Sequence, residues 1–114
     1  MWDLKTLSKL GHLTAINPDH KHEEGDSRIF VFGSNLQGIH GGGAAWYAHN
    51  KLGAVMGIGI GRTGRTYALP TCSRPGMNLS HAQVAVWVAL FLSHAEWCFA
   101  NEPVTRFFVS PVGC

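Results

Sequence analysis

The residues best suited to chemistry lie in a glycine-rich stretch directly after an apolar run. Ile29 to Phe32 are consecutive, bulky and uncharged, and five glycines follow between Gly33 and Gly43. Glycines lack a Cβ atom, permit positive φ and let backbone N–H groups approach an anion before a helix begins. The pattern favours a cradle for phosphate or pyrophosphate. The alternative is a strand-to-helix connection whose glycines serve only the turn.

Two polar side chains within this stretch are candidates for catalysis. Asn35 has an amide that donates and accepts hydrogen bonds, and His40 is the one titratable side chain of the loop. The stretch is not a Walker A motif, because Gly38 is followed by Ile39 and His40 where Lys and Ser or Thr would stand. The sequence therefore gives little support for an ATPase.

A second glycine pattern, Gly59, Gly61 and Gly64, matches GxGxxG. In a dinucleotide-binding motif these glycines would precede a helix, whereas here they precede a strand-like run at 66–69. We therefore do not interpret them as a dinucleotide-binding motif. We expect an irregular β-hairpin or lid-like loop. Its Arg62 and Arg65 either reach a ligand phosphate or remain surface arginines without a ligand.

The remaining pattern predicts β-α-β-α-β, with strands at 29–32, 66–69 and 105–110 and helices at 44–52 and 80–101. Pro70 is expected to halt the second strand, and Ser80 with Gln83 to form a capping box. Right-handed crossovers make such a sheet parallel, so the loops after its strands share one carboxyl edge. The residues expected to converge on a ligand there are Gly33, Ser34, Asn35, His40, Gly41, Gly42, Gly43, Thr71, Pro111 and Gly113, with Arg62 joining them from the lid-like loop.

The helix expected at 80–101 is apolar on nearly all sides. In a small domain this predicts burial from two sides or a subunit interface, and hence a homodimer or another protein partner. Gln83, Ser93, His94 and Glu96 interrupt the run, so we interpret it as a core helix and expect no membrane span.

Composition narrows the class further. The 114 residues suffice for one domain, expected at 28–114 after an N-terminal arm and polar loop at 1–27. A formal charge of +2 without a basic run gives no footprint for duplex nucleic acid. The N-terminus lacks the apolar core of a signal peptide, and three distant cysteines suit reduced thiols, so we expect a cytoplasmic protein. His20, His22, Glu23 and Glu24 lie on a polar loop, so we expect no metal site and no cofactor.

Three segments resemble the small macrodomain-like proteins of bacteria and their phages. The segments are FVFGSNLQGIHGGGAA at 30–45, GIGRTGRTYALPT at 59–71 and FFVSPVGC at 107–114. The family carries a FGSNxxGxHGxGAA motif, a later SYAIPT-like strand and a final TxIGCGxAG-like loop. The resemblance implies an α/β, three-layer-like macrodomain-type fold with a mainly parallel central sheet. The similar proteins continue past the Gly-Cys pair, so we expect the fold to be C-terminally shortened.

The resemblance also implies a function, because macrodomains bind ADP-ribose and related nucleotides at the strand carboxyl edge. Asn35 matches the position that contacts the distal ribose in hydrolytic members, Gly41–Gly43 match the first diphosphate loop, and Pro111–Gly113 the start of the second. Three hypotheses follow. The chain binds an NAD-derived or phosphorylated nucleotide, or it hydrolyses an ADP-ribosyl bond with Asn35 and His40, or it is a phage or mobile-element protein that modulates a host defence protein by binding it. The loops expected at the site contain no carboxylate for an acid and base pair.

Overall fold

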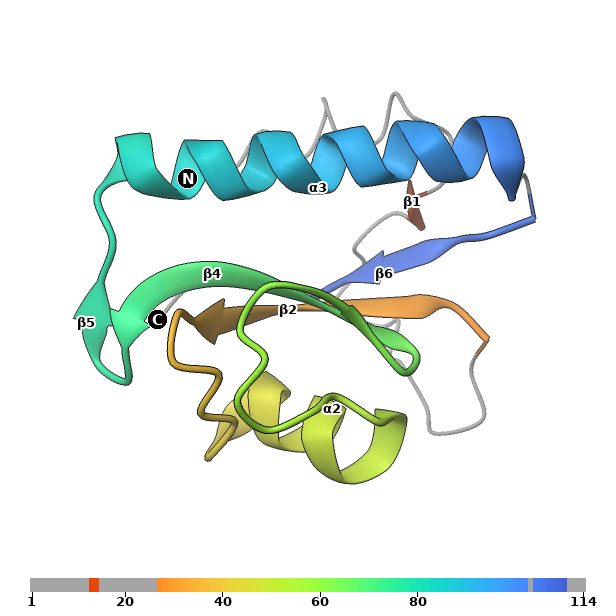
Figure 1. The fold of residues 1–114 in the computed structure, drawn as a ribbon. Helices are drawn as coiled ribbons and strands as arrows, with labels where there is room; N and C mark the ends of the chain where they lie inside the picture. The colour runs from red at the N-terminus through yellow and green to blue at the C-terminus, as the bar shows by residue number, and fades with distance from the viewer. Residues whose placement is uncertain (1–12, 15–26, 103, 111–114) are drawn as a thin grey trace.

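The chain forms a small α/β domain with a helix on each face of one mixed sheet (Figure 1). The computed structural model describes residues 13–14, 27–102 and 104–110. Within these residues the order along the six-stranded sheet is β1-β6-β2-β4-β3, and β5 pairs with β4. The elements are β1 (Leu13–Thr14), β2 (Ile29–Asn35), α2 (Gly43–Leu52), β3 (Gly61–Thr63), β4 (Thr66–Arg74), β5 (Met77–Asn78), α3 (His81–Asn101) and β6 (Phe107–Val109).

The parallel centre of the sheet agrees with the prediction. Strand β2 lies between β6 and β4 and runs parallel to both. Two short strands, β3 and β5, pair with β4 in the antiparallel sense and make the sheet mixed. The expected irregular hairpin is confirmed as β3 and β4. Much of the expected N-terminal arm, and the His20 to Glu24 cluster, lie outside the described residues.

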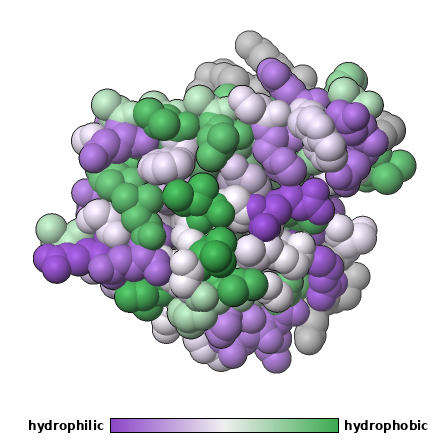
Figure 2. Space-filling view, viewed as in Figure 1, coloured by the Kyte–Doolittle hydropathy of each residue, from purple (hydrophilic) through white to green (hydrophobic). Residues whose placement is uncertain are grey.

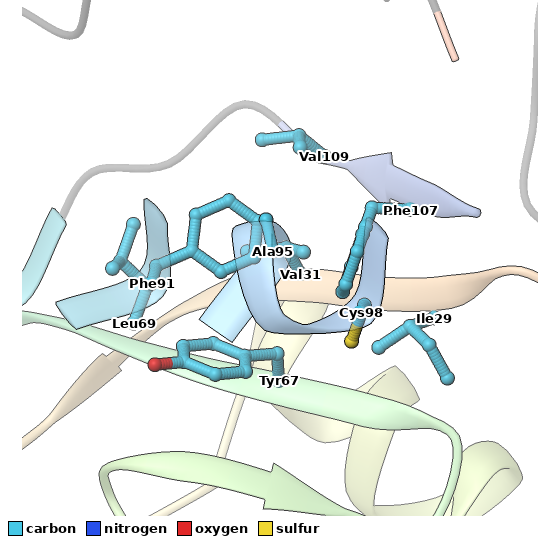
Figure 3. Packing of buried hydrophobic residues seen from close by; sticks show 9 residues of the cluster. All are labelled: Ile29, Val31, Tyr67, Leu69, Phe91, Ala95, Cys98, Phe107 and Val109. Atoms are coloured by element: carbon cyan, nitrogen blue, oxygen red, sulfur yellow. The ribbon is translucent and has the colours of Figure 1, made fainter. Parts of the chain in front are cut away.

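Strand β2 is buried on both faces, as its consecutive apolar residues predicted. Ile29 and Val31 point into a cluster beneath α3, whereas Phe30 and Phe32 point into a cluster beneath α2. Their alternation follows from the two-residue period of a strand. Figure 3 shows the α3 side, where Phe91, Ala95 and Cys98 pack over strand residues that include Tyr67, Leu69, Phe107 and Val109. Apolar packing on both faces therefore fixes β2 as the centre of the domain.

Local signals set the ends of both helices. Helix α2 begins one residue before the expected start and ends before Gly53, whose φ of +89° stops the helix. Helix α3 begins with the predicted capping box, in which Ser80 accepts from the N–H of Gln83 while the Gln83 side chain accepts from the N–H of Ser80.

One stripe of α3 faces the sheet, and the rest of the helix is exposed. The buried residues are Val84, Phe91, Ala95 and Cys98. Val86 and Leu90 retain 61% and 47% exposure, so burial from two sides is not found within the described chain. By length and composition α3 would also suffice to cross a membrane. This is weak evidence, because core helices of soluble proteins satisfy the same criterion.

The end of β4 differs from the prediction. Pro70 does not halt the strand, which continues to Arg74, and the short strand β5 follows it before α3 begins. Pro70 is tolerated because β3 pairs with β4 only as far as Ala68, so no ladder N–H is needed from Pro70 on that side. The register with β2 shifts after Pro70, so that Asn35 lies opposite Cys72. This shift leaves Thr71 as an extra residue, as in a β-bulge.

Tyr67 supplies a test of the packing beneath α3. Burial raises the pKa of its phenol to about 12. In the unfolded chain the Tyr67 phenol ionises near pH 10. The free energy of unfolding should therefore fall as the pH rises from 10 to 12. The loss should approach roughly 2–3 kcal/mol, at about 1.4 kcal/mol per pH unit. Urea unfolding at pH 8 to 11.5 measures it. Tyr67→Phe should flatten this dependence and Tyr47→Phe should keep it, and equal slopes in all three chains would contradict the assignment.

Candidate functional site

The loop after β2 is closed by the side chain of Asn35. Its Nδ2 donates to the carbonyl oxygen of Ile39 at 2.9 Å, and its Oδ1 accepts from the Ile39 N–H at 3.0 Å. The Asn35 carbonyl oxygen accepts from the Gly38 N–H at 3.0 Å. Asn35 is 7% exposed. In this conformation Asn35 therefore shapes the loop, and its amide has one N–H left over for a ligand or water.

A second segment, residues 53–60, lies directly on this loop, and we call it the strap. The N–H of Gly57 donates to the carbonyl oxygen of Gly38 at 2.8 Å, and the Ser34 hydroxyl donates to the carbonyl oxygen of Gly59. A Cβ atom on Gly59 would lie 2.0 Å from the Asn35 carbonyl oxygen. Figure 1 shows the strap returning from the end of α2 towards the carboxyl end of β2. Close backbone contact of this kind requires glycine.

His40 is the side chain that fastens the strap most extensively. Its Nε2 lies 3.0 Å from the carbonyl oxygen of Val55 and 3.1 Å from that of Ile58. Both partners are acceptors, so Nε2 carries the hydrogen and donates to them. The ring is 1% exposed and packs edge-on against Phe32. Its Nδ1 has no hydrogen-bond partner among the described residues. His40 is therefore a buried fastening between two loops.

The start of α2 is the open part of the site. Gly41, Gly42 and Gly43 are exposed, and a Cβ built on any of them would meet nothing within 4 Å. No side chain caps the helix at Gly42, and the first turn, described in full, contains no acidic residue. The first N–H groups of a helix lack intrahelical acceptors and carry partial positive charge. The N–H groups at this end of α2 can donate hydrogen bonds to an anion.

Several of the described candidates lie together at the carboxyl edge, and their contact with a ligand stays a prediction. Gly33 and Ser34 lie in β2, and the Thr71 hydroxyl donates to the Ser34 carbonyl oxygen at 3.4 Å. Ser110, which was not among the predicted site residues, directly follows β6 and donates through its N–H and its hydroxyl to the Val31 carbonyl oxygen. Pro111 and Gly113 lie outside the described residues. The edge thus brings together the ends of β2, β4 and β6.

Arg62 does not join this group. It lies in β3 opposite Tyr67, and its guanidinium is 3.8 Å from the carboxylate of Glu102 at the C-terminal end of α3. That end of α3 precedes the start of β6 and so marks the amino edge of the parallel strands. The expected contact of Arg62 with a phosphate at the carboxyl edge is therefore wrong for this conformation. The glycines predicted an irregular segment here, but its Arg62 contacts Glu102 at the amino edge of the sheet.

Beside Arg62 lies a thiol and imidazole pair from α3. The Sγ of Cys98 is 3.4 Å from Nε2 of His94. Burial, together with Glu102, raises the pKa of the Cys98 thiol, and burial, together with Arg62, lowers the pKa of His94. Both pKa shifts are consistent with a neutral His94 imidazole that accepts a hydrogen bond from a neutral Cys98 thiol. Cys98 is buried and free.

Large apolar side chains surround the fastened loops. Six of them expose between 38% and 50% of their surface, and we call them the apolar rim: Leu36, Ile39, Val55, Met56, Ile58 and Ile60. Figure 2 shows hydrophobic residues gathered across the middle of this face, where Figure 1 draws the strap. The signal for this surface was present in the sequence, because residues 55–60 alternate large apolar residues with glycine.

The comparisons with known proteins name no relative. No family model, no curated protein and no solved structure matches the chain significantly.

The glycine requirement of the strap gives a direct test of this geometry. Gly59→Ala places a methyl group against the Asn35 carbonyl, so we expect a loss of about 2 kcal/mol or more in the free energy of unfolding. Gly41→Ala meets open space and should change it by less than about 0.5 kcal/mol. Urea unfolding of both variants measures the difference. Equal stability of the two variants would show that the strap does not lie against Asn35.

Proposed function

We propose that the chain binds ADP-ribose or a related NAD-derived or phosphorylated nucleotide. The phosphates would lie against the N–H groups that begin α2, at the carboxyl edge of the parallel strands. The observation that carries the proposal is the uncapped, open and acid-free start of α2. Open α/β sheets bind ligands at this edge, and phosphates favour helix N-termini.

The local electrostatics support an anionic ligand. The N-terminus of a helix carries roughly half a positive elementary charge, and an anion there gains about 0.3–1 kcal/mol at an exposed site. The sequence at 33–43 and at 53–60 contains no Asp or Glu that would repel a phosphate. Glycines at 41–43 leave the backbone accessible from outside.

The resemblance to macrodomain-like proteins supports the same ligand class and a macrodomain-type version of the α/β fold. It matched Asn35 to a ribose-contacting position. With Ile39 already hydrogen-bonded to both ends of the amide, Asn35 would contribute its remaining N–H and the loop shape. The glycine loop then supplies the diphosphate contacts.

Hydrolysis of an ADP-ribosyl bond has less support than binding. The Nε2 of His40 is held by two carbonyl oxygens, and the ring is buried. A general acid or base must reach the reacting group within hydrogen-bond distance, directly or through one water. We therefore propose no catalytic step for Asn35 or His40.

Gly42→Asp tests the proposed phosphate site. Asp at the N-cap would occupy the free N–H groups and add negative charge, so it should stabilise the fold by about 0.5–1 kcal/mol while abolishing nucleotide binding. Thermal unfolding with and without ADP-ribose in large excess measures both effects, since ligand at about 100 times its Kd adds roughly 2.7 kcal/mol. Two variants serve as controls. Gly42→Asn caps the helix without adding charge, and Asn50→Asp adds the same charge near the C-terminal end of α2 and should leave nucleotide binding intact. Undiminished binding by Gly42→Asp would place the phosphates elsewhere.

A second candidate is protein binding through α3, in a phage or mobile-element protein that modulates a host protein or associates with itself. The observation that favours it is the apolar outer side of the helix, where Val86, Leu90 and Trp97 follow helical spacing and remain 61%, 47% and 51% exposed. Exposed aromatic and aliphatic side chains in one region are typical of protein interfaces.

Sedimentation velocity over a range of concentrations tests self-association through this side of α3. The wild-type chain should sediment as a dimer at high concentration, and Leu90→Glu should remain a monomer with unchanged melting temperature. Ile58→Glu, with a similarly exposed apolar residue on the strap, is the matched control and should still dimerise. A wild-type chain that is monomeric at every concentration would remove the homodimer and leave a different partner to be sought.

A further inference from the structure

Four polar side chains meet where the last turns of α3 lie beside β3, and we call them the amino-edge cluster: Arg62, His94, Cys98 and Glu102. His94 and Cys98 in α3 and Glu102 at its C-cap are spaced by four residues, so they lie along one side of the helix. The Sγ of Cys98 lies 3.4 Å from Nε2 of His94 and has a hydrogen bond with the Arg62 side chain. The Arg62 guanidinium lies 3.8 Å from the Glu102 carboxylate. The cluster therefore links β3 to α3 through continuous polar contacts.

Aromatic rings hold the imidazole of His94 in place. It stacks on Tyr67 of β4, with ring centroids 5.4 Å apart, and on Trp97 of α3, with centroids 6.2 Å apart. The ring of Phe107 in β6 meets it edge-on at 6.0 Å. The faces of aromatic rings attract a cation as well as a neutral ring, so these contacts serve His94 with or without its second proton. Protonation therefore changes the hydrogen bonds and ion pairs of the ring and leaves its position unchanged.

The hydrogen bond from Cys98 requires the neutral form of His94. A protonated imidazole carries hydrogen on both nitrogens and accepts no hydrogen bond, so the buried thiol would lose its acceptor. The added positive charge would also repel Arg62 and attract Glu102, the two charged groups that act on the ring. Burial and Arg62 lower the pKa of His94, whereas Glu102 acts in the opposite sense. Tyr67 adds no charge below neutral pH, because burial raises the pKa of its phenol to about 12.

We propose that the amino-edge cluster is a pH-sensitive switch in which protonation of His94 breaks its hydrogen bond with Cys98 and separates Arg62 from Glu102. In the neutral state the cluster fastens β3 to the end of α3. In the protonated state this fastening is released, while the backbone pairing of residues 61–63 with β4 holds the hairpin in the sheet. The strap ends two residues before Arg62, so the switch controls the anchoring of its downstream end to α3.

NMR of the full chain between pH 8 and pH 5 tests the proposal. The side-chain N–H signal of Arg62 should shift with the same midpoint as the His94 ring, and this midpoint should lie below the usual value of about 6.5. Amide hydrogen exchange at residues 98–102, corrected for its intrinsic pH dependence, should become about 10-fold faster at pH 5, which corresponds to one pH unit of linkage. The range ends above the usual pKa of an exposed glutamate, about 4.3.

Two histidine variants identify the titrating group. His94→Gln keeps a neutral amide that can accept from Cys98, so the Arg62 signal and the corrected exchange should no longer change between pH 8 and pH 5. His81→Gln removes an exposed histidine from the other end of α3 and should leave both pH responses as in the wild-type chain. Wild-type pH responses in the His94→Gln chain would overturn the proposal.

A charge variant tests the coupling in the reverse direction and does not depend on the folding of His94→Gln. Arg62→Gln removes the cation that opposes protonation, so the midpoint of His94 should rise. Arg74→Gln, which removes an exposed arginine from the other end of β4, is the matched control and should leave the midpoint in place. An unchanged His94 midpoint in Arg62→Gln, or an Arg62 signal that stays constant while His94 titrates in the wild-type chain, would overturn the proposal.

Discussion

The burial of β2 on both faces is the constraint from which the rest of the structure follows. Four consecutive apolar residues, Ile29 to Phe32, cannot be covered by one layer, so α2 and α3 must lie on opposite sides of the strand. The polar and glycine residues that follow then emerge at the sheet edge between two layers. Every contact of the candidate site begins from that point.

The strap is the second consequence of this arrangement. Chain that leaves α2 must return to the sheet at β3, and its path crosses the carboxyl end of β2. Gly38 and Gly59 allow backbone to pass over backbone there, and His40 donates to two strap carbonyl groups at the crossing. The same crossing turns large apolar residues outward beside the start of α2. The contacts that hold the strap against the loop after β2 therefore also position the candidate ligand-binding surface.

The elements that the sequence predicted are those specified by local patterns. The strand at Ile29–Phe32 followed from an apolar run, the start of α3 from the capping box at Ser80, and the end of α2 from Gly53. The parallel centre of the sheet followed from their order. The convergence of Ser34, Thr71 and the glycine loop was predicted by the same reasoning, because it depends on topology and on no particular side-chain contact.

The features that sequence reasoning missed depend on distant partners. Nothing near His40 in the sequence indicates that its acceptors are Val55 and Ile58, and nothing near Arg62 indicates Glu102, forty residues later. The continuation of β4 through Pro70 depends on how far β3 extends, which is a property of the folded sheet. Exposure of one side of α3 likewise appears only when the layers are assembled.

The central claim is that a nucleotide places its phosphates at the start of α2. Two-dimensional amide NMR of the labelled chain, titrated with ADP-ribose, tests it at individual N–H groups. The account predicts that the amide signals of residues 41–45 shift most, whereas those near Glu102 at the opposite edge of the sheet remain in place. Shifts concentrated around Arg62 and Glu102, or no shift at 41–45 at saturating nucleotide, would contradict it.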